Sequence, residues 1–305
     1  MIKWGFVNGQ EIVKYTLTNS NNQEVDVVTY GATITAIRTP DKEGNIADVV
    51  LGFDNVEEYQ SSNNPYFGAT IGRVANRISK ATFVVDGQQY QVSKNIGENS
   101  LHGGTHGWSS KVWNASIDHD RVIMTLISPN EDEGYPGRTT NAEELYKHVF
   151  TLNADHWTVT DSESIPTGEI RPVENSVMDL RNVTVLGDVI DKVPGGGYDY
   201  NFCLSEHDYE KRNLVAKVLH PDSGRSLEVY SNQPGVQLYT SNFLPERNNT
   251  GILGKDGVRY FKHAAFCLET QNYPDAVNHE NFPNSILRPG AKYNHIVIYK
   301  FGVRV

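Results

Sequence analysis

The sequence contains few cysteines, no long apolar run and no excess of basic residues. Its 305 residues include 2 cysteines, and 27 Lys and Arg stand against 37 Asp and Glu, which gives a formal net charge of −10. A negatively charged surface is poorly suited to nucleic acid or to an anionic membrane, so we expect neither as a partner. The longest apolar run, residues 264–268, is far shorter than the roughly 20 residues of a membrane-spanning helix, so we expect no transmembrane segment.

The cysteines and the N-terminus both point to a reducing compartment. Cys203 and Cys267 each lie in an apolar stretch, which predicts two buried free thiols rather than a disulfide or a metal pair. The first residues lack the basic region and apolar stretch of a signal peptide, so we interpret them as the start of the folded domain. We therefore expect a soluble, cytoplasmic protein, and we expect it to be a monomer.

Apolar residues alternate with polar ones along most of the chain, and turn residues interrupt the pattern about every ten residues. This pattern predicts an all-β fold, an antiparallel β-sandwich. No linker or repeat divides the chain, so we expect a single domain over residues 1–305. The predicted strands include three hairpins, 12–17 with 25–30, 83–85 with 90–92 through Asp86-Gly87, and 215–219 with 227–230, and two further strands, 236–239 and 295–301. Residues 141–149 instead predict a short helix, because an Asn N-cap precedes a Glu by three residues.

Two carboxylates stand out by their context. Glu269 follows an apolar run directly, and Asp199 follows three glycines and begins an aromatic-rich stretch. Glu269 is either an exposed residue at a strand end or a base whose pKa is raised at the mouth of the sandwich. The glycines before Asp199 either permit close approach of a ligand or form a plain flexible loop.

A glycine-rich segment and a basic segment are further candidates. His102 and His106 have metal-ligand spacing, but Gly103, Gly104 and Gly107 argue against the helix that such a pair needs, so we expect no metal. An imidazole next to Trp108 suits a polar ligand such as a sugar better, because an aromatic face stacks on its C–H face. Residues 72–78 (GRVANRI) contain two arginines and an asparagine, which are either ligand-binding groups or simple partners in surface ion pairs.

Seven motifs occur along the chain in a fixed order: 71–78 (IGRVANRI), 100–104 (SLHGG), 134–137 (GYPG), 165–168 (IPTG), 198–204 (YDYNFCL), 233–239 (QPGVQLY) and 266–278 (FCLETQNYPDAVN). On these motifs the chain resembles the aldose 1-epimerase (galactose mutarotase) family, most closely its animal-type cytosolic members. The resemblance extends nearly from end to end. It implies the galactose mutarotase-like form of the sandwich.

The resemblance also implies a reaction and a set of site residues. Glu269 would be the general base that removes the proton of the anomeric hydroxyl of an aldohexose such as galactose or glucose. The positions that contact the sugar in the family match Asn76, Arg77, His102, Asp199 and Gln237. Ring opening needs only this proton transfer and protonation of the ring oxygen, so no cofactor is implied.

One family motif is missing. The family's general acid is a histidine in an Asn-His-x-Tyr-Phe motif, which precedes the Ile-Pro-Thr-Gly motif. Here the chain continues from Gly137 through a few residues to 145–155, which resemble the family segment that follows the missing motif. This indicates an internal deletion near 138–147, with the loss of several strands and of the acid. The deletion could belong to an isoform, to a gene-model error or to a divergent protein.

Three functions fit these observations. The first is an aldose 1-epimerase with a weakened or substituted acid, and the alternative is a non-catalytic sugar-binding protein. A hexose-6-phosphate epimerase is disfavoured, because the chain has no basic cluster beyond Arg73 and Arg77 to bind a phosphate.

Overall fold

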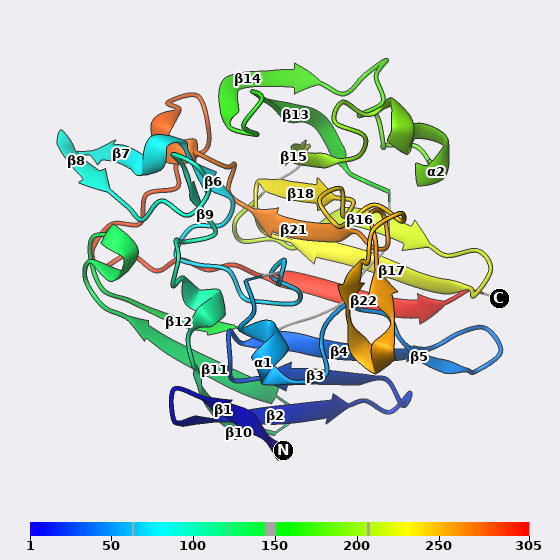
Figure 1. The fold of residues 1–305 in the computed structure, drawn as a ribbon. Helices are drawn as coiled ribbons and strands as arrows, with labels where there is room; N and C mark the ends of the chain where they lie inside the picture. The colour runs from blue at the N-terminus through cyan, green and yellow to red at the C-terminus, as the bar shows by residue number, and fades with distance from the viewer. Residues whose placement is uncertain (63, 120, 144–150, 206–207, 305) are drawn as a thin grey trace.

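β-Strands make up most of the fold (Figure 1). The structure is a computed structural model that describes residues 1–62, 64–119, 121–143, 151–205 and 208–304. The strands are β1 (Ile2–Val7), β2 (Gln10–Thr18), β3 (Glu24–Val28), β4 (Thr33–Pro40), β5 (Ile46–Asp48), β6 (Arg77–Ile78), β7 (Thr82–Val85), β8 (Gln88–Gln91), β9 (Ser100–Leu101), β10 (Asn114–Asp118), β11 (Arg121–Ser128), β12 (Thr139–Glu143), β13 (Ala154–Thr160), β14 (Pro166–Pro172), β15 (Asp199–Leu204), β16 (Asn213–Leu219), β17 (Arg225–Ser231), β18 (Gly235–Tyr239), β19 (Ile252–Leu253), β20 (Arg259–Tyr260), β21 (Cys267–Gln271) and β22 (Val297–Val303).

Helices are short in the described part of the chain. The α-helices α1 (Val56–Tyr59) and α2 (Leu186–Val189) have four residues each, and the 3₁₀ turns are Ser79–Ala81, Trp108–Ser110, Asp132–Gly134, Ile190–Lys192, Lys255–Gly257 and Ala276–Asn278. None of the described helices has the length and apolar character needed to cross a membrane.

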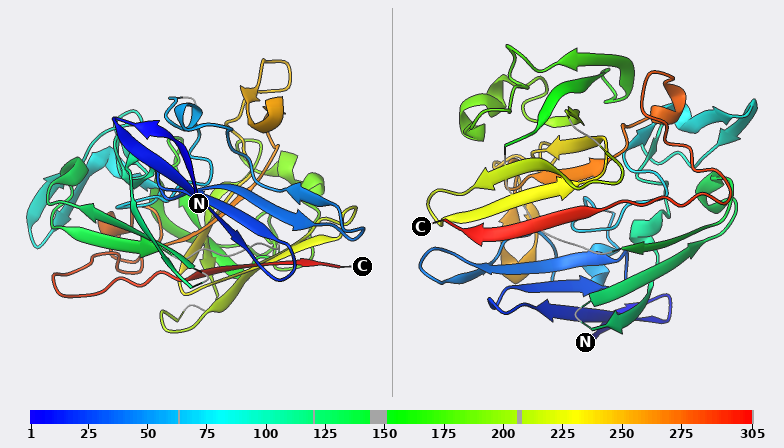
Figure 2. Two further views of the ribbon diagram at one scale, coloured as in Figure 1. Left: turned by 90° about the horizontal axis from the view of Figure 1, so that it is seen from below. Right: turned by 180° about the vertical axis from the view of Figure 1, so that it is seen from behind.

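The strands form antiparallel sheets. The largest have the orders β1-β2-β3-β4-β5 and β14-β13-β15-β18-β21, and two three-stranded sheets have the orders β10-β11-β12 and β16-β17-β22. The short pairs β6-β9, β7-β8 and β19-β20 lie outside these sheets. We call β1-β2-β3-β4-β5 the N-terminal sheet. Seen from the front and from behind, β22 lies between β17 and this sheet (Figures 1 and 2).

The main core lies between two of these sheets. Trp157, Phe202 and Leu238 belong to the sheet β14-β13-β15-β18-β21, and they pack in one cluster with Val215 and Val229 of β16 and β17. A sheet that is apolar on one face buries it against another sheet, which is the architecture of a β-sandwich. The prediction of an all-β sandwich is therefore confirmed.

The N-terminal sheet has its own contacts with the rest of the chain. Tyr15 and Val27 pack with Met124 and Leu126 of β11. At the other end of the sheet, Arg225 donates hydrogen bonds to the carbonyl oxygens of Thr39 and Asn45. These contacts join the β4–β5 hairpin to the turn between β16 and β17.

The predicted hairpins are confirmed. β2 pairs with β3, β16 with β17, and β7 with β8. In the last of these, Asp86 and Gly87 have φ values of 54° and 76°, the pair of positive values that a two-residue hairpin turn requires. The predicted strand 295–301 begins later, at Val297.

The predicted helix at 141–149 is wrong where the structure describes it. Residues 139–143 form β12, in which Asn141 pairs with Leu126 and Glu143 with Met124 of β11. A strand ladder with β11 satisfies the backbone groups that the local sequence would have paired within a helix, so the tertiary contact overrides the local preference. Residues 144–150, which include the second part of the predicted deletion site at 138–147, lie outside the described residues.

The prediction for the cysteines is half right. Both thiols are free, and Cys203 is buried, but Cys267 is exposed. Cys267 begins β21 on the face of the sheet opposite to the core, so its apolar neighbours Phe266 and Leu268 contribute to the core while its own side chain does not.

Candidate active site

Three adjacent strands present polar side chains on the face opposite to the core. Asn201 of β15 pairs with Gln237 of β18, which pairs with Glu269 of β21. Side chains alternate between the two faces of a strand, so Phe202, Val236 and Leu268 lie on the core face. The same alternation that builds the core therefore lines up a row of polar groups. Figure 1 shows these strands side by side in the upper half of the molecule.

Hydrogen bonds connect the amides of this face to Asp199. Gln271 Nε2 donates to Gln237 Oε1 at 3.3 Å and to Asn201 Oδ1 at 3.2 Å. Gln237 Nε2 in turn donates to Asp199 Oδ1 at 2.8 Å. The chain of amides fixes which atom of Gln237 faces the carboxylate, because the nitrogen must donate to Asp199 and the oxygen must accept from Gln271.

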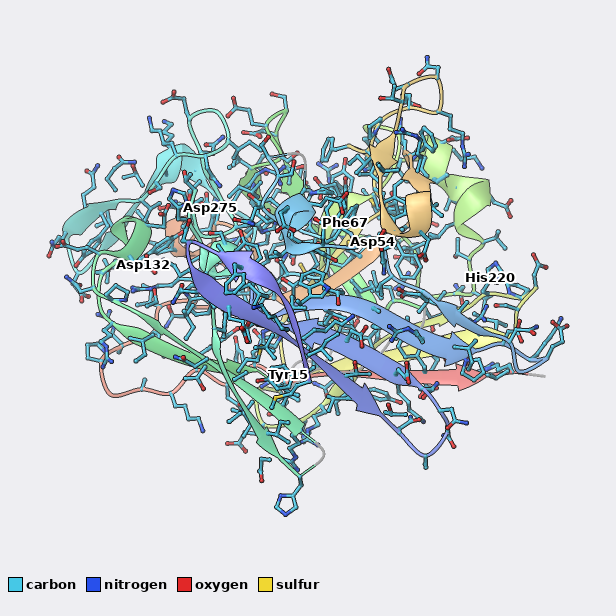
Figure 3. All side chains as sticks on the ribbon, turned by 60° about the horizontal axis from the view of Figure 1, so that its bottom comes forward. Tyr15, Asp54, Phe67, Asp132, His220 and Asp275 are labelled. Atoms are coloured by element: carbon cyan, nitrogen blue, oxygen red, sulfur yellow. The ribbon has the colours of Figure 1, made fainter. Side chains whose placement is uncertain are left out.

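A second set of residues reaches the site from the β6–β9 pair. Arg77 pairs with Leu101, and this places Asn76 beside His102, whose backbone N–H donates to the Asn76 carbonyl at 3.0 Å. Arg77 Nη1 lies 3.9 Å from Asp199 Oδ2. Asp275, which is labelled in Figure 3, follows β21 and donates its backbone N–H to the Arg77 carbonyl. Segments far apart in the sequence thus meet at Asp199.

Close backbone packing holds the His102 loop in place. Gly103 has a φ of +86°, and a Cβ atom there would lie 1.9 Å from the carbonyl oxygen of Gly72. Only glycine allows this approach between the two loops. The ring of Trp108 packs on Gly72 and meets Trp113 edge to face, so it has a structural role, and the ring next to His102 is Tyr66, at 4.9 Å.

Glu269 differs from Asp199 in its surroundings. Within the described chain no hydrogen bond or ion pair reaches its carboxyl group, and part of the side chain is open to solvent. Protein atoms surround the rest, and this burial, with the negative charge of Asp199, raises the pKa of Glu269 to about 7, although Arg77 acts in the opposite direction. Glu269 is therefore partly protonated at neutral pH.

His102 is held as a neutral ring of defined tautomer. Its Nδ1 atom accepts a hydrogen bond from the backbone N–H of Asn76 at 3.2 Å, so the proton of the neutral ring lies on Nε2. Burial, and secondarily the charge of Arg77, lowers the pKa of His102 to about 4. His102 can donate a hydrogen bond from Nε2, but at neutral pH it is not an imidazolium acid.

Several buried polar atoms near this face lack a hydrogen-bond partner among the described residues. They are Arg77 Nε, Asn201 Nδ2 and Gln271 Oε1. Buried polar groups are nearly always satisfied by protein, water or ligand, so these atoms have hydrogen-bonding capacity that the described residues do not use. No group of three or more metal-ligating side chains occurs in the part of the chain that the structure describes.

Arg73 does not belong to the site. Its guanidinium donates to the carbonyl oxygens of Ser128, Pro129, Tyr135 and Pro136. This anchors the loop that carries Asn76 and Arg77 to the end of β11, so of the two sequence-predicted cations only Arg77 faces Asp199.

The structure brings together all the predicted site residues and adds others. Asn201, Tyr239, Cys267 and Gln271 lie on the same face as Glu269 by strand alternation. Counting in steps of two from Glu269, Gln237 and Asp199 within their motifs would have identified all four from the sequence.

Comparison with known proteins identifies the family of this chain. The family model described as aldose 1-epimerase matches residues 13–142 and 139–300. The chain is 38% identical to galactose mutarotase of Sus scrofa, over 97% of this chain and 96% of that protein, and 27% identical to aldose 1-epimerase of Escherichia coli, over 96% of each.

A solved structure of a GalM/aldose epimerase homologue from C. elegans matches with a TM-score of 0.85 and 26% identity, over 96% of this chain and 99% of that one. Galactose 1-epimerase from Lactobacillus acidophilus, at 23% identity over 99% of this chain and 98% of that one, has the same fold with a TM-score of 0.78. With both halves matched by the family model and with near-complete coverage of relatives at 38% identity, the chain belongs to the aldose 1-epimerase family of isomerases.

Proposed function

We propose that this chain is an aldose 1-epimerase that interconverts the α and β anomers of an aldohexose such as galactose or glucose. The observation that carries the proposal is the position of Glu269, whose carboxyl group has no partner among the described residues and whose pKa lies near 7. The reaction requires a group that removes the proton of the anomeric hydroxyl, after which the ring opens, the aldehyde rotates and the ring closes on its other face. A carboxylate with a pKa near the working pH suits this role.

The neighbouring residues suit the hydroxyl groups of a sugar. Asp199 accepts hydrogen bonds, Arg77 and Asn76 carry buried donors, and His102 offers an Nε2 proton. Gln237, already oriented by its own hydrogen bonds, offers its remaining N–H. A hydroxyl group both donates and accepts, so a site with fixed donors and acceptors can hold a sugar ring in one orientation.

The proposed internal deletion also has support. The alignment with the Sus scrofa protein spans 335 positions, more than the 305 residues of this chain, so it opens gaps in this sequence. The two segments matched by the family model meet at residues 139–142, next to the break between the motifs. Both observations favour a deletion near 138–147, and we propose that the lost segment carried the histidine acid.

The structure argues further against a hexose-6-phosphate epimerase, because one of its two candidate phosphate-binding arginines is engaged elsewhere. The Arg73 guanidinium is occupied by backbone carbonyls, so it is not available for a phosphate. Single-domain organisation, a monomeric state and a cytoplasmic location stay predictions. Size-exclusion chromatography with light scattering measures the oligomeric state.

Polarimetry of freshly dissolved α-galactose tests the proposed function. We expect the protein to accelerate the change in optical rotation above the buffer rate. A protein that binds galactose in calorimetry without any acceleration would instead be the non-catalytic sugar-binding protein.

A further inference from the structure

The two carboxyl groups of the site differ in how many of their oxygens are engaged. Asp199 uses one oxygen to accept from Gln237 and directs the other at Arg77. No described residue forms a hydrogen bond or an ion pair with the carboxyl group of Glu269, so both of its oxygens are free to bind a ligand. A carboxyl group with two free oxygens can accept one proton and donate another at the same time.

Among the described residues, no other group that faces Glu269 is a ready acid at neutral pH. Glu269 faces the Cys267 thiol on its own strand, the Tyr239 phenol on β18 and Asp199 on β15, and Arg77 and His102 approach from the β6–β9 pair. Burial is the main cause that raises the pKa of Tyr239 to about 12. His102 is neutral, because its pKa is about 4.

We infer that Glu269, in its protonated form, performs both proton transfers of the reaction, and so replaces the missing histidine acid. This inference rests on the proposed function. The two oxygens of a carboxyl group are bonded to the same carbon atom. The hydroxyl oxygen O1 and the ring oxygen O5 of a hemiacetal are likewise bonded to one carbon, C1. The two groups can therefore form a pair of hydrogen bonds side by side.

The step balances in atoms and electrons. The protonated oxygen of Glu269 gives its proton to O5, and the C1–O5 bond breaks with its electron pair moving to O5. The O1–H bond gives its proton to the other oxygen of Glu269, and the electrons of that bond form the second C1–O1 bond of the aldehyde. Glu269 ends with one proton, on the opposite oxygen. After rotation about C1–C2 the same transfers in reverse close the ring on the other face.

The environment of Glu269 favours the protonated form of its carboxyl group. Burial and the charge of Asp199 raise the pKa of Glu269 to about 7, so a large fraction of the carboxyl groups carries a proton below neutral pH. A base that worked with water as the acid would instead need the deprotonated form.

The test is the pH dependence of kcat/KM for α-galactose between pH 5.5 and 9.5, after subtraction of the buffer rate at each pH. We expect a level region at low pH and, above about pH 8, a fall of about tenfold per pH unit. A rate that rises through pH 7 to a plateau would mean a carboxylate base with water as the acid. A bell-shaped profile would mean a separate acid, and either result overturns the inference.

Variants assign the titrating group. Asp199→Asn should move the midpoint of the fall to lower pH, because a neighbouring negative charge is lost; an unmoved midpoint would mean that Glu269 is not the titrating group. Tyr239→Phe should keep the shape of the profile, and loss of the fall in this variant would assign the acid to Tyr239. Glu269→Gln should lose the acceleration at every pH, while the same change at the exposed Glu280 should not.

The inference and the proposed function fail in different ways. Acceleration with the wrong pH profile leaves the epimerase proposal intact and overturns only the role of protonated Glu269. Sugar binding without acceleration at any pH overturns the epimerase proposal, and the inference with it.

Discussion

Asp199 occupies the point where the two halves of the site meet. It accepts a hydrogen bond from Gln237 on the sheet and lies beside Arg77 from the β6–β9 pair. Its side chain is only 17% exposed, so its charge acts in a partly desolvated environment. It therefore influences both the binding of a sugar and the protonation of Glu269.

Replacing Asp199 by alanine should weaken galactose binding. A carboxylate that accepts from sugar hydroxyls contributes about 1.5–3 kcal/mol per hydrogen bond, so Kd should rise roughly 10- to 150-fold. Isothermal titration calorimetry measures this, with Asp222→Ala at an exposed turn as the control. An unchanged Kd in Asp199→Ala would exclude this residue from the binding site.

His102 should make the fold less stable in acid. Its pKa in the folded protein is about 4, below the ordinary value of 6.5, so the unfolded chain binds a proton that the folded chain does not between these pH values. This contribution to stability is complete above pH 6.5 and is lost as the pH falls toward 4. Urea denaturation measures the free energy of unfolding at pH 7.5 and at pH 5. The decrease between these pH values should be about 1–2 kcal/mol smaller in His102→Asn than in the parent. Equal losses in both proteins would contradict this.

At the level of elements, the site depends on alternation within strands and on close packing between loops. β15, β18 and β21 are each apolar on one face and polar on the other, so core and site share the same three strands. The β6–β9 pair adds Asn76 and His102 only because the backbone of Gly103 can approach Gly72. A change that separates these loops should affect the site without touching any site residue.

Gly103→Ala tests this packing. Its φ is +86° and the added Cβ would lie 1.9 Å from a backbone oxygen, so we expect a loss of about 2–3 kcal/mol in the free energy of unfolding and weaker galactose binding. Gly97→Ala is the matched control, because Gly97 also has a positive φ but no atom within 4 Å of the new Cβ. It should cost only about 1 kcal/mol and leave binding unchanged. Equal effects of the two substitutions would show that the contact with Gly72 is unimportant.

For the whole molecule, the main question is how the fold accommodates the proposed deletion. β12 pairs with β11 on one side, so residues 139–143, which follow the Gly-Tyr-Pro-Gly motif, form the third strand of the sheet β10-β11-β12. β22 pairs with β17 and lies between β17 and the N-terminal sheet (Figure 2). The arrangement of sheets agrees with that of the C. elegans homologue, with a TM-score of 0.85.

Restoring the missing motif should restore a separate acid. Inserting the family's Asn-His-x-Tyr-Phe segment between Gly137 and Leu145 should raise kcat/KM above pH 8 by about 10²–10⁴-fold, because there Glu269 has lost its own proton and one general acid contributes about this factor. The pH profile should become bell-shaped. The graft must first give the circular dichroism spectrum and cooperative unfolding of the parent. A folded graft without a gain in rate would mean that the deletion is catalytically silent.

Much of the fold follows from local sequence patterns. Each strand predicted from period-two alternation overlaps a strand of the structure, and Asp86-Gly87 correctly predicts its hairpin. Alternation and turn chemistry depend only on neighbouring residues, so they can be read from the sequence. The helix expected at 141–149 was wrong for 141–143, because pairing with β11 is a contact between distant residues. The exposure of Cys267 was missed for a related reason, since its two apolar neighbours concealed the direction in which its own side chain points.

The sequence by itself determined the all-β class, the order of the motifs and the family that they indicate, because these are properties of residue types and their spacing. Only the tertiary structure decided which groups act on one another. The pKa of Glu269 depends on Asp199 and Arg77, which are distant in sequence, and the tautomer of His102 depends on the backbone of Asn76. Arg73 and Arg77 are four residues apart and look alike in the sequence, yet one binds backbone carbonyls and the other faces Asp199. Electrostatic and hydrogen-bond energies depend on distance in space, and only the folded chain sets those distances.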